Sequence, residues 1–255
     1  MRILLKLGGT LLDTAETRER LAREIKELAA QDEVVVVHGG GKQMTRFLAE
    51  RGIESTFVNG LRVTTPDVID AVVKVFAGSV NAQLVTTLRA AGARPVGLSG
   101  FSAGLVDAVQ LSPELGQVGK PVSSDGRLLN LLVRGGYLPV IACVAGDANG
   151  SIFNVNGDQM AVACAAGFRA ETLVFLTDVE GVRDETGTTQ PQLTTAEARE
   201  LIRKGVATGG MQAKLESAAS AISQGVGQVW IAPGARAGII GLLRAGNPAG
   251  TKLIP

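Results

Sequence analysis

Two lysines and one aspartate lie beside glycines at the expected ends of strands or starts of helices, where packing rarely needs a charge. Lys6 precedes Gly8 and Gly9, Lys214 follows another glycine pair, and Asp158 opens an expected helix. Taken singly, each lysine could be a solvated surface residue and the aspartate a helix cap. Taken together, two ammonium groups, bare backbone amides and one ordering acid suit phosphoryl transfer, which depends on positioning and charge neutralisation. The set suits a carboxylate acceptor best, since a carboxylate is already ionised at neutral pH and needs no general base.

Glycine-rich turns follow two expected buried strands. Residues 2–7 form a nearly continuous apolar run that leads into Gly8 and Gly9, and residues 33–37 lead into His38 and then Gly40 and Gly41. Ligands of open parallel sheets bind at the carboxyl ends of the strands. Glycine amides are not obstructed by a Cβ atom, so the two turns together predict a site for an anion.

Further polar residues cluster in two other segments. Asn154, Asn156 and Asp158 alternate with Val155 and Gly157, which places them on one face of an extended segment. Arg62 stands in an otherwise apolar hairpin around Asn59-Gly60. Its guanidinium would suit a substrate carboxylate bidentately, although a surface position is an open alternative.

The sequence lacks the motifs of other nucleotide-binding folds and of histidine, cysteine or metal chemistry. The chain has no P-loop motif and no dinucleotide fingerprint. Its single histidine, His38, is expected to be neutral and bonded to backbone, and Cys143 and Cys164 are expected to be small buried hydrophobes, with no CxxC pair. No metal-ligand cluster is expected.

The composition sets the broad class. The chain has 255 residues with 25 basic and 24 acidic side chains, so no global field favours nucleic acid or an anionic membrane. We find no secretory signal pattern and expect no apolar run that approaches the roughly 20 residues needed to span a bilayer. A soluble cytoplasmic protein is therefore expected.

Strand and helix patterns alternate throughout, which predicts an α/β fold: a three-layer αβα sandwich around a central, mostly parallel sheet. The expected helices and strands are helices 14–30, 42–51, 66–91, 128–134, 159–166, 195–205 and 209–224, and strands 2–7, 33–37, 94–99, 138–144, 172–176 and 228–232. Residues 105–122 have hairpin character. The helix 66–91 is apolar all round and predicts a subunit contact. Two lobes, 1–172 and 173–255, are expected to share one continuous sheet.

Six motifs occur in a characteristic order and spacing. They are Lys6-Leu-Gly-Gly, His38-Gly-Gly-Gly, Asn59-Gly-Leu-Arg-Val-Thr, Asn154-Val-Asn-Gly-Asp, Thr177-Asp-Val-Glu-Gly-Val and Gly209-Gly-Met-Gln-Ala-Lys. Over essentially its whole length the chain thereby resembles the amino-acid kinase family. Any one motif alone would be a weak signal, but six in order are a strong one.

The resemblance implies a role for each matching residue. Lys6 and Lys214 match the two transition-state lysines, and Asp158 matches the acid that holds them. It also implies ATP as phosphoryl donor, with Mg²⁺ held mainly by ATP oxygens, an acetylglutamate-binding and dimerising lobe 1–172, and an ATP-binding lobe 173–255. The implied binding residues are Gly40, Gly41, Arg62, Asn154 and Asn156 for the substrate, and Gly8, Gly9, Asp178, Val179, Gly181, Val182, Arg183, Val206, Ala207, Thr208 and Gly209 for the nucleotide.

Within the family, the motifs resemble the branch that phosphorylates the γ-carboxylate of N-acetyl-L-glutamate in arginine synthesis. The alternatives are a sibling branch that acts on an aminoadipate group linked to a carrier protein, the carbamate, aspartate, glutamate and uridylate kinases of the same fold, and a catalytically silent nucleotide-binding regulator. Gly157 and Phe101 depart from the residues that relatives usually carry. The resemblance also implies that an extra amino-terminal helix joins dimers into hexamers in the arginine-inhibited members; this chain starts at its first strand, so a homodimer that arginine does not inhibit is expected.

Overall fold

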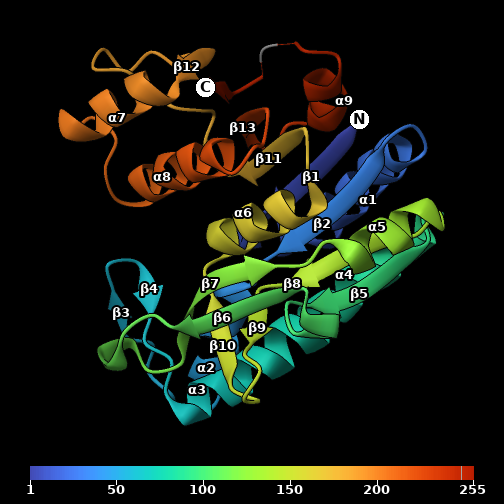
Figure 1. Cartoon of the computed structure of the whole chain (residues 1–255), viewed down its shortest axis with the longest axis vertical. Helices are drawn as coiled ribbons and strands as arrows, with labels where there is room; N and C mark the ends of the chain where they lie inside the picture. The colour runs from blue at the N-terminus through green and yellow to red at the C-terminus, as the bar shows by residue number, and fades with distance from the viewer. Residues whose placement is uncertain (248) are drawn as a thin grey trace.

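A computed structural model describes residues 1–247 and 249–255 (Figure 1). Within these ranges, eight strands form one continuous sheet in the order β12-β14-β13-β11-β1-β2-β8-β5. Neighbouring strands run parallel except at the β13–β14 pair, so the predicted mostly parallel sheet is confirmed. The strands are β1 (Arg2–Leu7), β2 (Glu33–His38), β3 (Phe57–Val58), β4 (Leu61–Arg62), β5 (Pro95–Ser99), β6 (Val106–Gln110), β7 (Val118–Ser124), β8 (Leu138–Ala142), β9 (Val144–Gly146), β10 (Ile152–Val155), β11 (Thr172–Thr177), β12 (Gln192–Thr194), β13 (Gln228–Pro233) and β14 (Thr251–Ile254).

Helices cover both faces of this sheet, which confirms the three-layer architecture (Figure 1). The helices α5, α6 and α8 pack on one face, and α1, α4 and α9 pack on the other. The α-helices are α1 (Ala15–Ala29), α2 (Gly41–Ala49), α3 (Pro66–Val72), α4 (Asn81–Ala90), α5 (Arg127–Arg134), α6 (Gly157–Phe168), α7 (Thr195–Arg203), α8 (Gly209–Ser223) and α9 (Ile239–Arg244).

The central strands are β-branched and apolar because both of their faces are covered. Val34 to Val37 of β2 are all buried, as are all six residues of β11. Strand β1 alternates instead: Ile3 and Leu5 face the α1 and α9 side, where they border a cavity with Leu28, whereas Lys6 faces α6. A lysine in the middle of a buried sheet is thus turned toward the layer that carries α6.

One expected buried strand is an edge strand instead. The sequence predicts residues 94–99 as a third buried strand, but β5 pairs only with β8 within the described residues and lies at the end of the sheet. Pro95, Val96 and Leu98 are only half-buried, and Gly97 is exposed. An apolar run of five residues does not distinguish the two positions, because both strands contact a covered face.

The predicted helix 66–91 is a single helical run, Pro66–Ala90, with a π-helical segment, Val73–Val80, between α3 and α4. Contrary to the expectation that no apolar run approaches bilayer length, this run is long and apolar enough by length and composition to cross a membrane. Half of its most apolar window is buried within the fold, as in the core helices of α/β proteins. Its exposed side carries small and polar residues such as Ser79, Gln83 and Thr86 rather than an apolar surface.

Two smaller β units lie beyond the carboxyl end of the sheet. The predicted hairpin character of 105–122 is confirmed by the antiparallel pair β6 and β7, which closes a small barrel with β9 and β10. This barrel was not expected from the sequence. The Asn59-Gly60 turn connects β3 and β4 as predicted, and both turn residues have positive φ, 50° and 77°.

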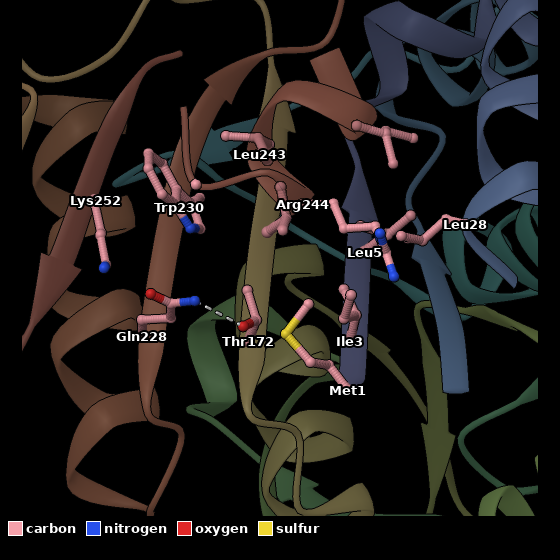
Figure 2. A pocket seen from close by; sticks show the side chains of 13 residues that line it. Met1, Ile3, Leu5, Leu28, Thr172, Gln228, Trp230, Leu243, Arg244 and Lys252 are labelled. Carbon is pink, nitrogen blue, oxygen red and sulfur yellow. Dashed lines mark hydrogen bonds between the residues drawn. The ribbon is translucent and has the colours of Figure 1, made fainter. Parts of the chain in front are cut away.

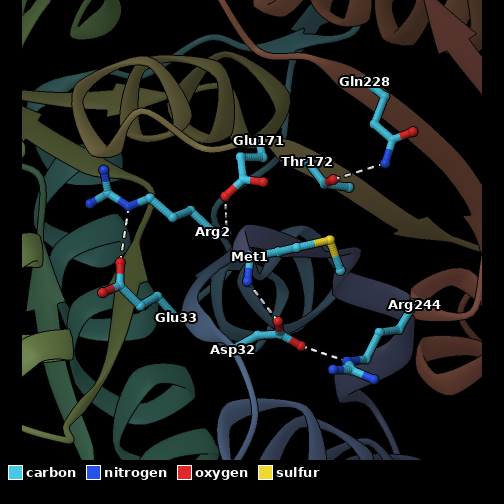
Figure 3. A network of polar contacts seen from close by, with 8 residues as sticks. All are labelled: Met1, Arg2, Asp32, Glu33, Glu171, Thr172, Gln228 and Arg244. Carbon is cyan, nitrogen blue, oxygen red and sulfur yellow. Dashed lines mark hydrogen bonds and ion pairs between the residues drawn. The ribbon is translucent and has the colours of Figure 1, made fainter.

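At the opposite, amino-terminal end of the strands, ion pairs gather around Asp32 and Glu33, and the pair between Asp32 and Arg244 connects the two predicted lobes (Figure 3). The α-amino group of Met1 lies 2.8 Å from Oδ1 of Asp32, and Nε of Arg244 in α9 lies 2.6 Å from Oδ2. Burial alone would raise the pKa of Asp32, but the hydrogen bonds from these two cations outweigh it and lower the pKa. Nε of Arg2 lies 3.0 Å from Glu33 in the same region.

Candidate active site

Lys6, Asp158 and Lys214 meet at the carboxyl end of the central strands. The Lys6 ammonium in β1 lies 2.7 Å from Oδ1 of Asp158, and the Lys214 ammonium in α8 lies 3.2 Å from Oδ2. The three side chains come from three elements, and the aspartate is only 8% exposed. The sequence expectation that one acid stands between two lysines is therefore met by geometry, whereas their catalytic roles remain predictions.

The two lysines of this trio keep the aspartate ionised. Burial alone would raise the pKa of Asp158, yet the two lysines outweigh burial and lower its pKa, so the carboxylate stays ionised. The Lys6 and Lys214 side chains are 12% and 20% exposed, so neither is fully enclosed. Two cations that share one carboxylate carry a net positive charge, and a phosphate group is the natural complement.

Local structure fixes the position of Asp158. Oδ1 of Asn156 accepts hydrogen bonds from the amides of Asp158 and Gln159, at 2.9 and 3.2 Å, so Asn156 is the N-cap of α6. The sequence predicts that Asn156 binds the substrate, and it leaves open that Asp158 is only a helix N-cap. In the structure the cap role belongs to Asn156, and the carboxylate is left for the lysines.

Gly157 brings the Lys6 side chain close to the backbone. A Cβ atom at this position would lie 3.1 Å from Cε of Lys6 and 3.5 Å from Sγ of Cys143. An alanine at this position would therefore require the Lys6 side chain to shift by a few tenths of an ångström.

The two glycine turns lie against each other, as predicted. A Cβ atom built on Gly9 would be 3.2 Å from the amide nitrogen of Gly41, and the amide of Gly8 donates to the carbonyl of Leu176 in β11. The N–H groups of Gly40 and Gly41 have no hydrogen-bond acceptor within the part of the chain that the structure describes. Both amides precede or begin helix α2, whose dipole favours an anion at that end.

Arg62 and Asn154 are connected through a residue that the prediction did not single out. Nη2 of Arg62 donates to Oγ1 of Thr45 at 2.8 Å and to the carbonyl of Gly41 at 3.3 Å. Nδ2 of Asn154 donates to Oγ1 of Thr64 at 3.1 Å, and Thr64 donates to the backbone carbonyl of Arg62 at 2.8 Å. The structure thus brings Gly41, Arg62 and Asn154 together, with Thr64 as the connecting side chain.

The guanidinium of Arg62 is nearly enclosed, with 8% of the residue exposed, so the surface alternative is excluded. It stacks over the Phe57 ring at 4.6 Å and also bonds Ser55. Burial lowers its pKa, although arginine remains charged at neutral pH. No carboxylate forms an ion pair with it within the described residues, so its charge is available to an acidic ligand.

The predicted nucleotide residues occupy two segments. The first is Asp178 to Arg183, directly after β11, where Gly181 has φ of 144° and the buried Val182 donates its amide to Thr251 at 2.7 Å. The second runs from Val206 to Gly209, where the amide of Ala207 bonds Leu201 and Gly209 begins α8. Thr208 and Gly209 lie about 8–9 Å along the helix axis from Lys214, at 1.5 Å per residue. Nucleotide binding by these two segments and by the glycine turn stays a prediction. The residues concerned are Asp178, Val179, Gly181, Val182, Arg183, Val206, Ala207, Thr208 and Gly209, together with Gly8 and Gly9.

A metal would find few protein ligands here. No group of three or more acidic, histidine or cysteine residues is arranged to hold an ion within residues 1–247 and 249–255. Both oxygens of Asp158 already face ammonium groups. The donor set therefore fits a metal carried by a phosphate ligand and not one held by the chain.

The two cysteines behave as predicted. Cys143 and Cys164 are free and buried, and burial raises the pKa of the Cys143 thiol to about 12.

A separate cavity of about 170 Å³ lies on the other face of the sheet, between β1, β11 and β13 and helix α9 (Figure 2). Apolar side chains line most of it, including Ile3, Trp230 and Leu243, with Arg244 and Lys252 at its border. It contains none of the residues of the trio. We therefore place the candidate active site at the glycine turns, where the charges and bare amides are.

Known proteins resemble this chain in both sequence and structure. The sequence model described as the Amino acid kinase family matches residues 1–233. An acetylglutamate kinase of Solibacter usitatus is 60% identical over 255 residues, which are 100% of this chain and 99% of that protein. An acetylglutamate kinase of Acidobacterium capsulatum is 41% identical over 244 residues, with 94% of each protein covered. The crystal structure of an N-acetylglutamate synthase of Neisseria gonorrhoeae, complexed with coenzyme A and N-acetyl-glutamate, matches with a TM-score of 0.87 at 26% identity over 99% of this chain and 59% of the synthase.

Proposed function

The chain belongs to the amino acid kinase family, and from this premise we propose that it transfers the γ-phosphoryl group of ATP to the γ-carboxylate of N-acetyl-L-glutamate. The products are ADP and N-acetyl-L-glutamyl 5-phosphate, an intermediate of arginine biosynthesis. Full-length similarity to proteins named acetylglutamate kinase supports the substrate. The observation that carries the proposal is the pairing of Lys6 and Lys214 with the two oxygens of one buried aspartate.

The reaction forms one P–O bond and breaks another. An oxygen of the γ-carboxylate attacks the γ-phosphorus of ATP, and the bond between that phosphorus and the bridging oxygen of ADP breaks. The carboxylate has an ordinary pKa of about 4.3, so it is ionised at neutral pH and no base has to remove a proton. The chain therefore has to align two anions and neutralise the charge between them.

Each part of the site has one task in this scheme. Lys6 reaches the region between donor and acceptor, Lys214 reaches the nucleotide phosphates, and Asp158 holds both ammonium groups in place. Preorganised cations and amides of this kind stabilise charge that develops in the transition state without having to reorganise. Arg62 and Asn154 grip the α-carboxylate and neighbouring polar atoms of the substrate, because a buried arginine without an acidic partner suits a carboxylate.

Mg²⁺ is carried by the ATP phosphates in this proposal. Asp158 cannot serve as its ligand while both of its oxygens contact lysines. When bound, the ion would neutralise phosphate charge. The chain contributes the lysines and glycine amides that complete this neutralisation.

The assembled enzyme is a cytoplasmic homodimer in our proposal. The outer edge of β5 is unpaired among the described strands, and α4 next to it exposes small and polar residues such as Ala82 and Thr86. An unprotected edge strand tends to pair with a second chain. Sedimentation equilibrium that yields the mass of a single chain at micromolar concentration would rule the dimer out.

A hydroxylamine trap tests the activity directly, because hydroxylamine converts an acyl phosphate into a coloured hydroxamate. Purified protein is incubated with ATP, Mg²⁺ and one of several acids: N-acetylglutamate, N-acetylaminoadipate, glutamate or aspartate. Signal with N-acetylglutamate above all others is expected. Equal or greater signal with N-acetylaminoadipate would favour the sibling branch, and ATP binding without any signal would favour a silent regulator.

A matched pair of variants identifies the source of the signal. Lys6→Ala removes a site ammonium, whereas Lys74→Ala removes an exposed lysine that pairs with Asp70 on α3. We expect the first to lower the rate of hydroxamate formation on the order of a hundredfold or more and the second to leave it unchanged. Equal activity of the two variants would show that the trio is not the site.

A further inference from the structure

The peptide between Gly39 and Gly40 is held by a buried ring. Nδ1 of His38 lies 2.8 Å from the carbonyl oxygen of Gly39, and the His38 side chain is fully buried. All described peptide bonds are trans, and in a trans peptide the C=O and the following N–H point in opposite directions. A ring that fixes the Gly39 carbonyl therefore also fixes the direction of the Gly40 N–H, which has no acceptor within the described chain.

The hydrogen bonds around this ring determine its tautomer. A backbone carbonyl only accepts, so Nδ1 of His38 must carry the proton that it shares with Gly39. Nε2 of the neutral ring is then an acceptor, and Nδ2 of Asn81 lies 2.9 Å from it. The same Nδ2 lies 3.0 Å from the carbonyl of Val140, which also only accepts and so fixes the orientation of the Asn81 amide. The Nδ1 proton of His38 and the two Nδ2 protons of Asn81 therefore each have an acceptor in this buried network.

The helix that carries Asn81 also touches the glycine turn directly. A Cβ atom on Gly40 would lie 2.9 Å from Cδ1 of Phe76 and 3.3 Å from Cγ2 of Val80. Phe76 and Val80 lie in the π-helical segment, and the amide of Asn81 bonds the carbonyl of Phe76, five residues earlier. A π-helix bonds residues five apart, and from this helix Phe76 and Val80 pack against Gly40 while Asn81 contacts the His38 ring.

Asn81 in turn has little freedom to move. It is 6% exposed, and a Cβ atom on Gly97 of β5 would collide with its Oδ1, so the amide fills the space that this glycine leaves. The backbone of His38 is held as well, because Sγ of Cys143 donates to the His38 carbonyl at 3.0 Å. The ring is thus enclosed by β2, β8 and α4.

We propose that His38 and Asn81 are positioning residues for phosphoryl transfer: Asn81 selects the tautomer in which His38 holds the Gly39 carbonyl, and the Gly40 N–H is thereby aimed at the transferred phosphoryl group. This role rests on the proposed kinase function. Gly9, on the turn after Lys6, approaches the same segment, since a Cβ on it would lie 3.7 Å from Cα of Gly40. The segment that carries this amide therefore lies beside the turn that follows Lys6.

The tautomer can be read without any substrate. His38 is the only histidine of the chain, so its two ring nitrogens give unambiguous signals in long-range ¹H–¹⁵N spectra. We expect a neutral ring protonated at Nδ1 at about pH 7. Asn81→Leu, similar in size but unable to donate, is expected to lose this single tautomer. A wild-type ring protonated at Nε2 would overturn the proposal even if the enzyme is an active kinase.

Kinetics then separate positioning from folding. His38→Asn retains a donor near the Nδ1 position, whereas His38→Gln places its amide near Nε2, so the first should keep more activity. We expect kcat to fall on the order of tenfold or more in His38→Gln and Asn81→Leu, with KM values nearly unchanged, because misdirecting one transition-state donor costs part of the 10²–10³-fold lost on removing it. Equal loss in His38→Asn and His38→Gln, or full kcat in Asn81→Leu, would overturn the assignment.

Leu88→Ala serves as the structural control. Leu88 lies in the same helix as Asn81, is fully buried, makes no hydrogen bond to the ring and is not among the atoms nearest to a Cβ on Gly40. This variant should lower the melting temperature and retain kcat below it. If it lost kcat as Asn81→Leu does, general destabilisation would explain both and the proposal would fail. Failure of the kinase function itself would appear differently, as wild-type protein with the expected tautomer but no acyl phosphate.

Discussion

Stability in mild acid offers a sharp test of how His38 is held. Burial lowers the pKa of this ring from 6.5 to about 4, although the hydrogen bond to Gly39 acts in the opposite direction. Between these two values the unfolded chain binds a proton that the folded chain does not. The stabilisation is therefore complete above the unfolded pKa and is lost as the pH falls through the folded pKa.

The magnitude follows from the two pKa values. One unit corresponds to about 1.4 kcal/mol, and between about pH 7.5 and pH 4.5 the unfolded ring gains nearly its full proton while the folded ring gains only a fraction. The free energy of unfolding should therefore fall by about 2.5 kcal/mol over this range on account of His38 alone. Other groups titrate as well, so the value has to be measured as a difference.

Urea denaturation of the wild type and of His38→Asn at several pH values provides that difference. The variant lacks the titrating ring and retains every other ionisable group. We expect the wild type to lose about 2.5 kcal/mol relative to the variant between about pH 7.5 and pH 4.5. A difference that does not change with pH would show that the ring is not buried in the neutral form, and the tautomer reasoning would fail with it.

Three further substitutions test the site. Lys6→Ala should lower kcat on the order of a hundredfold or more with little change in fold, measured by the hydroxamate assay and circular dichroism, and an unchanged kcat would remove Lys6 from the transition state. Arg62→Ala should chiefly raise KM for N-acetylglutamate, because the guanidinium grips the bound substrate as well as the transition state; a fall in kcat alone would exchange its role with that of Lys6. Gly40→Ala should lower both kcat and the melting temperature, since its Cβ would lie 2.9 Å from the Phe76 ring and the ring or the turn must move; wild-type values for both would show that the turn is not tightly packed.

Much of the fold could be predicted because several strands are continuous runs of apolar or β-branched residues. The valine run of β2 and the apolar run of β1 leave few alternatives, and Thr14 caps α1 where the sequence places the start of a helix. The barrel of β6, β7, β9 and β10 was missed because it joins segments that are far apart in the chain. The edge position of β5 was missed because pairing partners are a property of the whole sheet.

The site divides in the same way. Lys6, Asp158 and Lys214 could be identified because charges beside glycines at element ends are unusual. Their contacts, such as the one between Asp158 and Lys214 across 56 residues, depend on tertiary structure. The sequence around Asn81 does not indicate a functional residue, because a single polar residue within an apolar helix is normally assigned to the exposed face. Thr64 was visible only as part of a motif, and its role in connecting Arg62 with Asn154 depends on the barrel.

A crystal structure with ADP, N-acetylglutamate and an aluminium fluoride mimic of the phosphoryl group would test the central claim most directly. The account predicts the ammonium groups of both Lys6 and Lys214 within about 3 Å of the mimic or the oxygens beside it, each still in contact with Asp158. Either ammonium directed away from the mimic, or the two lysines separated from each other and from the aspartate, would contradict it.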